Sequence, residues 1–466
     1  SYSNRNTNNN RNGSSRIMSQ IEVDKIIPQS GTTLTVGDSG DTVTLTSGAN
    51  LSVDGTIKLD GNYPTGPNNV ALGDTALDSV QAGGNCNVAI GHGAGTAITT
   101  ADNNVAVGAG ALITNATSNN NTAVGRNSLT LNTGAENTAM GYLSASANSS
   151  GASNVAVGVC ALRQATTVNN NTAIGTCALE ATTTGANNTA VGFSAMDTNT
   201  TGCENVAVGR DTMFTGTTAK RSVAVGYRAL KSVETGNNNV AVGFCALNAN
   251  TTASANTAIG DIALLNNTSG TCNTAVGANS LLANTTAVGN TGVGINSLTA
   301  NTEGFNNVGV GNCAGGKTTT GDCNTYIGSF AGYTNVTGGN NTAVGDQALS
   351  LATTNNNTAV GRSAACATTT GFATAVGYRA MKANTTSSGN TAMGFQTMCA
   401  VTTGSNNTAY GLEALKSVVS GSGNTGIGRD ALEMNTAGDN TAVGYEALKL
   451  NVGGSRNSAV GRNTLE

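Results

Sequence analysis

The chain has 466 residues, of which only 10% are charged and 3% aromatic, and its formal net charge is −4. Nucleic-acid binding requires a basic surface, and a chain with so few charges and a slightly acidic net charge does not supply one. The composition therefore argues against a nucleic-acid-binding role. No stretch approaches eighteen consecutive apolar residues, so we expect no insertion into a membrane.

The first part of the chain differs in composition from the rest. Residues 1–17 are rich in Asn, Arg and Ser and predict a flexible arm. Residues 18–62 contain short alternating apolar runs, such as Leu34 and Val36, separated by Gly-containing turns, and predict a small separate module of β-strands. Residues 63–68 hold two prolines and predict a linker.

A repeat array fills residues 69–466. The pattern Asn-x-Ala-x-Gly, in identical or close variants, recurs twenty-four times between Asn69 and Gly461, and eighteen of the twenty-three steps are seventeen residues long. One step has eighteen residues and four have sixteen. We number the positions of each repeat from its first residue, which is offset zero. Such a period predicts a solenoid in which every repeat packs only on its neighbours.

The first offsets of each repeat predict a strand and a turn. Offset one is Val or Thr and offset three is large and apolar, as at Thr122 and Val124, so both lie on one face of an extended strand. We expect this Val/Ile row to be buried. Offset two is nearly always Ala, with Tyr326 as an outlier, which indicates close approach of another group to the opposite face. Offset four is always Gly, which predicts a positive φ or a tight backbone contact.

A second apolar pair occupies offsets seven and eight, as at Ala161 and Leu162. We interpret it as a second short strand, because such runs are too short between breakers to form helices. The expected fold is therefore all-β: a parallel β-roll or β-solenoid of about 24 coils. At about 4.8 Å per layer it would form a rod on the order of 110 Å long, with ladders of Asn at offset zero.

A single coil of this kind is thin, so packing several chains along a common axis would increase burial. The Ala/Gly face at offset two, where something must approach closely, favours the same arrangement. We therefore expect a homo-oligomer.

One segment matches a phosphate-binding pattern. Residues 311–318 read GNCAGGKT and fit GxxxxGK[ST]. A functional phosphate-binding loop needs a helix after it, and the next repeat begins at Asn324 without room for one. We interpret Gly311 as the ordinary turn glycine of its repeat and predict no nucleotide site.

The other polar candidates form no predicted site. His92 is the only histidine, lies in the glycine-rich segment 91–95, and has no carboxylate or cysteine that the repeat places near it. Asp211, Glu303 and Asp430 stand at turn offsets without a fixed partner, which weakens a two-carboxylate glycosidase site. We therefore predict no catalytic, cofactor-binding or metal site, no cofactor and no enzyme.

The ten cysteines contain no CxxC pair. Cys160 and Cys177 both stand at offset six of adjacent coils and could touch. We expect the cysteines to be small buried side chains without disulfides. The Thr row at offset one leaves ice binding as an alternative, although Val interrupts it.

The repeat sequence resembles a known family. Residues 440–448, NTAVGYEAL, resemble the head repeat of YadA-type trimeric adhesins, in a likeness that covers about 85% of the chain. The resemblance implies a left-handed parallel β-roll that forms a homotrimer around a central axis. Residues 21–37, IEVDKIIPQSGTTLTVG, are similar to the N-terminal module of tail fibres of marine cyanobacterial phages.

Together the two resemblances imply a fibre of a virion. Its N-terminal module would bind tail proteins, and its β-roll would be the shaft that reaches an unidentified receptor on a host surface. The alternative is a bacterial surface adhesin of the YadA type, located at the cell surface.

Overall fold

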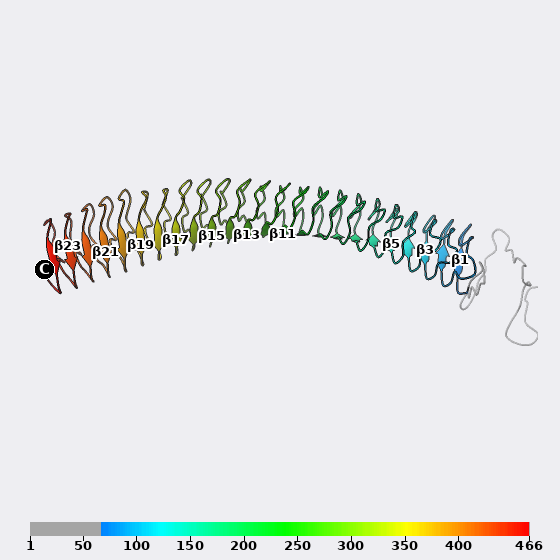
Figure 1. The fold of residues 1–466 in the computed structure, drawn as a ribbon, viewed down its shortest axis with the longest axis horizontal. Helices are drawn as coiled ribbons and strands as arrows, with labels where there is room; N and C mark the ends of the chain where they lie inside the picture. The colour runs from blue at the N-terminus through cyan, green and yellow to red at the C-terminus, as the bar shows by residue number, and fades with distance from the viewer. Residues whose placement is uncertain (1–66, 466) are drawn as a thin grey trace, which may run out of the picture. The chain divides into compact units, whose positions relative to one another are not determined.

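The computed structural model describes residues 67–465, and these form one sheet of twenty-four parallel strands. Each strand is three residues long and occupies offsets one to three of its repeat. Each pairs in register with the strands of the neighbouring repeats. Residues 67–465 contain no helix, and their coils stack into a gently curved rod (Figure 1). The predicted parallel β-solenoid is confirmed.

The strands follow one another at the repeat period. They are β1 (Val70–Leu72), β2 (Val88–Ile90), β3 (Val105–Val107), β4 (Thr122–Val124), β5 (Thr138–Met140), β6 (Val155–Val157), β7 (Thr172–Ile174), β8 (Thr189–Val191), β9 (Val206–Val208), β10 (Val223–Val225), β11 (Val240–Val242), β12 (Thr257–Ile259), β13 (Thr274–Val276), β14 (Thr291–Val293), β15 (Val308–Val310), β16 (Thr325–Ile327), β17 (Thr342–Val344), β18 (Thr358–Val360), β19 (Thr374–Val376), β20 (Thr391–Met393), β21 (Thr408–Tyr410), β22 (Thr425–Ile427), β23 (Thr441–Val443) and β24 (Ser458–Val460). The predicted arm at 1–17, the attachment module at 18–62 and most of the linker at 63–68 lie outside the described residues.

The glycine at offset four makes the tight turn that the sequence predicts. Gly192, directly after β8, has a φ of +140°, a conformation that side chains rarely adopt. A Cβ placed on it would lie 2.4 Å from the carbonyl oxygen of Gly209 in the next coil. The glycines of successive coils therefore stack backbone against backbone, which leaves no room for any side chain.

The anchor asparagines form the predicted ladder. The Oδ1 atom of Asn171 accepts a hydrogen bond from the backbone N–H of Asn188, at 2.8 Å. The Nδ2 atom of Asn188 in turn donates to the carbonyl oxygen of Gly202, at 2.9 Å. Both side chains are fully buried, so removing one leaves unpaired polar groups, which costs about 1–3 kcal/mol. The ladder holds adjacent coils in register.

A second asparagine ladder stands at offset eleven and was not predicted. Asn284 donates from Nδ2 to Oδ1 of Asn267 in the preceding coil, at 2.8 Å. Asn267 donates to the carbonyl oxygen of Gly270, at 2.9 Å, which closes the outer turn of its coil. Other coils carry Val, Ala, Thr, Ile or Gly at this offset, so the sequence shows no uniform pattern there.

The interior is built from Ala and Leu, which corrects the expected Val/Ile core. Ala156 in β6 is fully buried, whereas Val155 and Val157 on either side point outward and are half-buried. The interior is too narrow for larger strand residues: a Cβ placed on Gly292 would lie 3.3 Å from Cγ of Leu281. The close contact predicted at offset two therefore exists, but the group that makes it belongs to the same chain, on the opposite side of the solenoid interior. The Ala/Gly face consequently gives no support to an oligomer.

The second predicted strand is wrong, because offsets five to ten form a continuous turn. Cys160 and Leu162, at offsets six and eight, have φ values of 57° and 54°. In a strand, Ala161 and Leu162 would point to opposite faces. The left-handed conformation at Leu162 accompanies the burial of both side chains, which supplies the second apolar wall of the coil.

Tyr326 is accommodated inside the solenoid by glycines. Its side chain is 1% exposed, and its hydroxyl oxygen accepts a hydrogen bond from Nδ2 of Asn335. Gly315 and Gly332 replace the usual Leu at offset eight, and a Cβ on either would lie within 2.6 Å of the Tyr326 ring. Burial raises the pKa of the Tyr326 hydroxyl to about 12. The ring thus takes the space of two missing Leu side chains.

Candidate functional site

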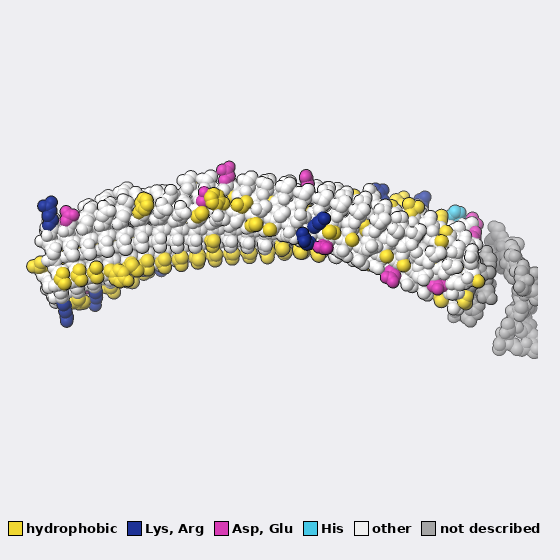
Figure 2. Space-filling view, in the orientation of Figure 1, with side chains coloured by type: hydrophobic (Ala, Val, Ile, Leu, Met, Phe, Trp, Pro, Cys, Tyr) yellow, Lys and Arg dark blue, Asp and Glu magenta, His cyan; other side chains and the backbone are white. Residues whose placement is uncertain are grey.

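The outward face of the strands carries a row of apolar side chains along the whole solenoid. The side chains at offset three stand outside in every coil, and those of Met140, Ile174 and Ile259 are 40–44% exposed. Figure 2 shows hydrophobic side chains in a row along the concave edge of the rod. In the described residues this face packs against no other element, since the single sheet has its interior on the other side.

The strand face is hollowed near β19 to β21. Val376, Met393 and Tyr410, at offset three of consecutive coils, border an open depression of about 380 Å³ together with two turn glycines. Tyr410 is 53% exposed and projects beside it. Met393 and Tyr410 stand where most coils carry Val or Ile, and the lining contains no titratable group other than the tyrosine.

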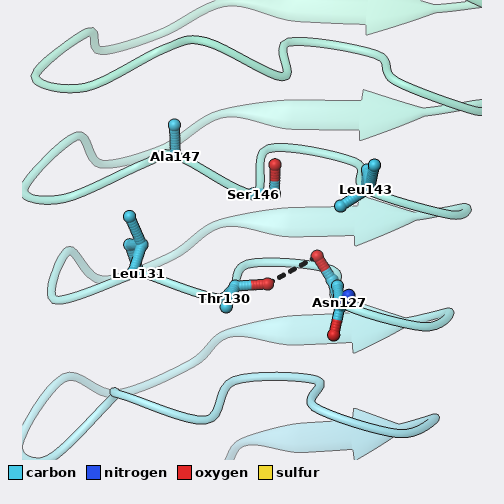
Figure 3. A pocket seen from close by; sticks show the side chains of 6 residues that line it. All are labelled: Asn127, Thr130, Leu131, Leu143, Ser146 and Ala147. Carbon is cyan, nitrogen blue, oxygen red and sulfur yellow. Dashed lines mark hydrogen bonds between the residues drawn. The ribbon is translucent and has the colours of Figure 1, made fainter.

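A second depression lies on the turns after β4 and β5. It has a volume of about 320 Å³, and Leu131 and Leu143 supply much of its lining (Figure 3). Thr130 closes one side by donating a hydrogen bond from Oγ1 to the carbonyl oxygen of Asn127, at 2.7 Å. The coil from Asn121 is one residue short, and this depression lies beside its outer turn. Its apolar lining and lack of charge offer no catalytic group.

A cluster of rings and arginines was missed by sequence reasoning. The guanidinium carbon of Arg210 lies 5.6 Å from the ring centroid of Phe193, and that of Arg228 lies 4.9 Å from the ring of Tyr227. Tyr227 stacks on Phe244 of the next coil, with centroids 5.3 Å apart and planes at 19°. These residues, together with Asp211, are called the central ring–arginine cluster. A shared offset was the signal: half of the Tyr and Phe residues in 67–465 stand at offset five, directly after the turn glycine.

The phosphate-binding pattern forms no phosphate site. Gly311 has a φ of +135° and is the turn glycine of its coil, as predicted. The side chain of Thr318 is fully buried inside the solenoid, and Lys317 lies with Nζ 5.0 Å from the ring centroid of Tyr333. The segment after Thr318 is not helical, so no helix N-terminus faces the loop.

His92 does have a carboxylate near it, which corrects the sequence-based expectation. Asp74 stands at the same offset in the preceding coil, and its Oδ2 atom lies 3.7 Å from Nε2 of His92. Both side chains are largely exposed, at 74% and 80%. A lone exposed pair of this kind lacks the third group of a triad and the further ligands of a metal site.

The acidic residues singled out from the sequence do not pair with one another. Asp211 lies between Arg210 and Arg228, and Asp430 forms an ion pair with Arg429, in which Oδ2 and Nε are 3.2 Å apart. Glu303 is exposed in an outer turn. In residues 67–465 no group of three or more His, Cys, Asp and Glu side chains is placed to hold a metal ion.

The ten cysteines are free thiols, but the expectation that they are buried is wrong. Cys86, Cys272 and Cys323 are exposed, and the others are half-buried. Offset six, where Cys160 and Cys177 stand, points outward along the turn. Burial and a hydrogen bond to Glu180 raise the pKa of the Cys177 thiol to about 12, so it stays protonated and unreactive at neutral pH.

The fold and surface define a parallel β-solenoid of stacked short-strand coils with an outward apolar face. The described part of the chain contains no helix that is long and apolar enough to cross a membrane. No protein-family model, no curated protein and no solved structure matches the chain.

Proposed function

We propose that the chain is the shaft of a virion tail fibre, a homotrimeric rod that holds a virion to the surface of its host cell. The observation that carries the proposal is the continuous outward apolar face of the twenty-four strands. The attachment role itself rests on the two resemblances in the sequence, to YadA-type heads and to phage tail-fibre N-terminal modules.

An exposed apolar face of this size favours association of copies. Soluble monomers rarely expose contiguous apolar patches above a few hundred Å². The strand face, about 110 Å long and about 10 Å wide, offers on the order of 1,100 Å² per chain, more than the roughly 800 Å² per partner of a standard interface. Its row at offset three is apolar throughout, and the row at offset one beside it is Thr in fifteen strands and Val in eight. The side chains on it are β-branched or large, as at Val225 and Ile259, and pack well between sheets.

The repeat geometry supports a mechanical role. Each coil bonds its neighbours through backbone pairing, which continues from β1 to β24. The buried asparagine ladder adds to this pairing wherever the anchor is asparagine, and Ser222 and Ala373 are the anchors that depart from it. A rod of this kind gains length with each coil and needs no catalytic centre. The number three comes from the resemblance to the YadA-type heads, and attachment to tail proteins is proposed for residues 18–62.

The oligomer is tested by sedimentation equilibrium of the full chain. We expect a mass three times that of one chain, which is 45.9 kDa. Val225→Asp with Val242→Asp places two charges in the centre of the strand face and should yield monomers. Thr235→Asp, in an exposed outer turn, is the matched control and should leave the trimer intact. A monomeric mass for the unaltered chain would contradict the proposal.

The location is tested by cryo-electron microscopy of virions labelled with an antibody against the rod. Label on tail fibres supports the virion fibre. Label on the surface of bacterial cells instead would favour the alternative, a YadA-type adhesin.

A further inference from the structure

The central ring–arginine cluster has features of a binding site. Phe193 and Phe244 are 52% and 53% exposed. They stand in one column with Arg210 and Tyr227, at offset five of four consecutive coils. Other coils carry Asn312 or Ser329 at the same offset without loss of the turn. The solenoid therefore does not require rings there, and their exposure needs another explanation.

A buried carboxylate positions the two guanidinium groups. The side chain of Asp211 is 13% exposed, and its Oδ2 atom lies 3.6 Å from Nε of Arg210 and 3.4 Å from Nε of Arg228. The arginine side chains themselves are 63% and 40% exposed. Their Nε atoms face the carboxylate, so the terminal amino groups are the donors that remain for a ligand. Such prior ordering lowers the entropic cost of binding.

The local charge has the opposite sign to that of the whole chain. Residues 188–255, the four coils that carry the cluster, contain five basic and four acidic residues, a net charge of +1, whereas the full chain has a net charge of −4. These coils are therefore slightly cationic on an acidic rod. The cluster repeats on a smaller scale where Arg379 lies 5.0 Å from the ring centroid of Tyr378, which stacks on Phe395 at 5.2 Å. Residues 373–406, which include it, carry two basic residues and no acidic one.

We propose that the central ring–arginine cluster binds an acidic polysaccharide, an inference that rests on the proposed attachment function. The apolar C–H faces of the sugar rings pack on Phe193, Tyr227 and Phe244. The sugar carboxylates accept charge-assisted hydrogen bonds from the two arginines, whose planar forks match a carboxylate. Successive coils lie about 4.8 Å apart, comparable with the length of one sugar unit, so an extended chain can follow the rod axis.

The chemistry of the cluster favours this class over nucleic acid. Nucleic-acid binding depends on neutralising many phosphates, and two arginines with one carboxylate between them supply too little charge. Exposed rings beside a few charged groups suit a ligand that has apolar ring faces and widely spaced anionic groups. Uronic-acid polymers have both.

The test is titration of the full chain with polygalacturonate, with neutral dextran as the comparison polymer. The unaltered chain should bind polygalacturonate more tightly than dextran, and added salt should weaken the binding. Arg210→Gln with Arg228→Gln should lower the affinity by about a hundredfold, because two charge-assisted hydrogen bonds to sugar carboxylates are lost. Tyr227→Ala with Phe244→Ala should weaken binding to both polymers.

Tyr142→Ala is the matched control, since Tyr142 stands at the same offset and is 45% exposed but is not part of either cluster. It should leave the affinity unchanged. Equal binding of the two polymers, or an equal loss with Tyr142→Ala, would overturn the site. Loss of the trimer in the Tyr227→Ala, Phe244→Ala chain would also overturn it, because the rings would then be interface residues. A chain that sediments as a monomer yet binds polygalacturonate through the arginines refutes the fibre and keeps the site.

Discussion

The coils around Tyr326 and the regular coils around Leu162 fill the same interior with different residues. In the regular coils a small Ala on the strand faces a Leu on the opposite turn. Near Tyr326 the sizes are exchanged, since the strand carries the large ring and Gly315 and Gly332 take the place of Leu. The comparison shows that the total side-chain volume between strand and turn is conserved, whereas its division between the strand and the turn is not.

The turn glycine permits no such exchange of volume, so we expect its substitution to have the largest effect on stability. Gly192→Val places a side chain within 2.4 Å of the Gly209 carbonyl oxygen and requires a φ of +140°, so no neighbouring residue can compensate. The coils near β8 should open, with loss of amide protection in hydrogen exchange and new protease cleavage between β7 and β9. Gly453→Val is the control, because a Cβ there meets nothing within 4 Å. Equal protection in both variants would contradict the stacking role.

The volume exchange predicts a rescue by a second substitution. Tyr326→Ala should lower local stability by about 3–5 kcal/mol through the cavity it leaves. Gly332→Leu alone should also destabilise, because its Cβ would lie 2.1 Å from the ring. The double variant restores the regular Ala–Leu pair, and Leu tolerates the backbone since Gly332 has a φ of +59° and Leu179 one of 52°. Hydrogen exchange of the amides in β15 to β17 should show that the protection lost in each single variant is recovered in the double variant. Stability losses that simply add in the double variant would show that the two side chains do not share one volume.

The smallest effect concerns the hydroxyl of the same ring. Burial raises the pKa of Tyr326 above its ordinary value of 10.0, to about 12, so the folded chain holds this proton more tightly than the unfolded chain. The stabilising contribution is therefore complete below pH 10 and is lost as the pH rises from 10 toward 12. Tyr326→Phe should remove this part of the alkaline destabilisation while costing about 1 kcal/mol at neutral pH. Identical pH profiles from 9 to 12 would contradict the burial effect.

The period-two pattern of Val155, Ala156 and Val157 predicts two faces but not which one is inside. Hydrophobicity alone favours the valines, and the structure buries the alanine because the opposite wall is too close for anything larger. That distance depends on the conformation of the turn that carries Leu162. Its positive φ is unusual for Leu and has no signature in the residue type.

The repeat register determines which features of the candidate sites could be judged from the sequence. The register of the repeat was sufficient to dismiss the phosphate-binding pattern, because Gly311 occupies the obligatory turn position. The register also places Asp74 beside His92, since both stand at offset five, and it places the rings of Tyr227 and Phe244 in one column. Equal offsets in neighbouring coils mean contact, so these pairs were accessible from the numbering alone.

The asparagine ladder at offset zero makes the rod extensible in fixed increments. The Oδ1 atom of each anchor asparagine bonds the backbone of the next anchor, so any coil that begins with asparagine can precede any other. Duplication or deletion of one whole seventeen-residue unit would change the reach of the rod by about 4.8 Å and leave every remaining joint equivalent.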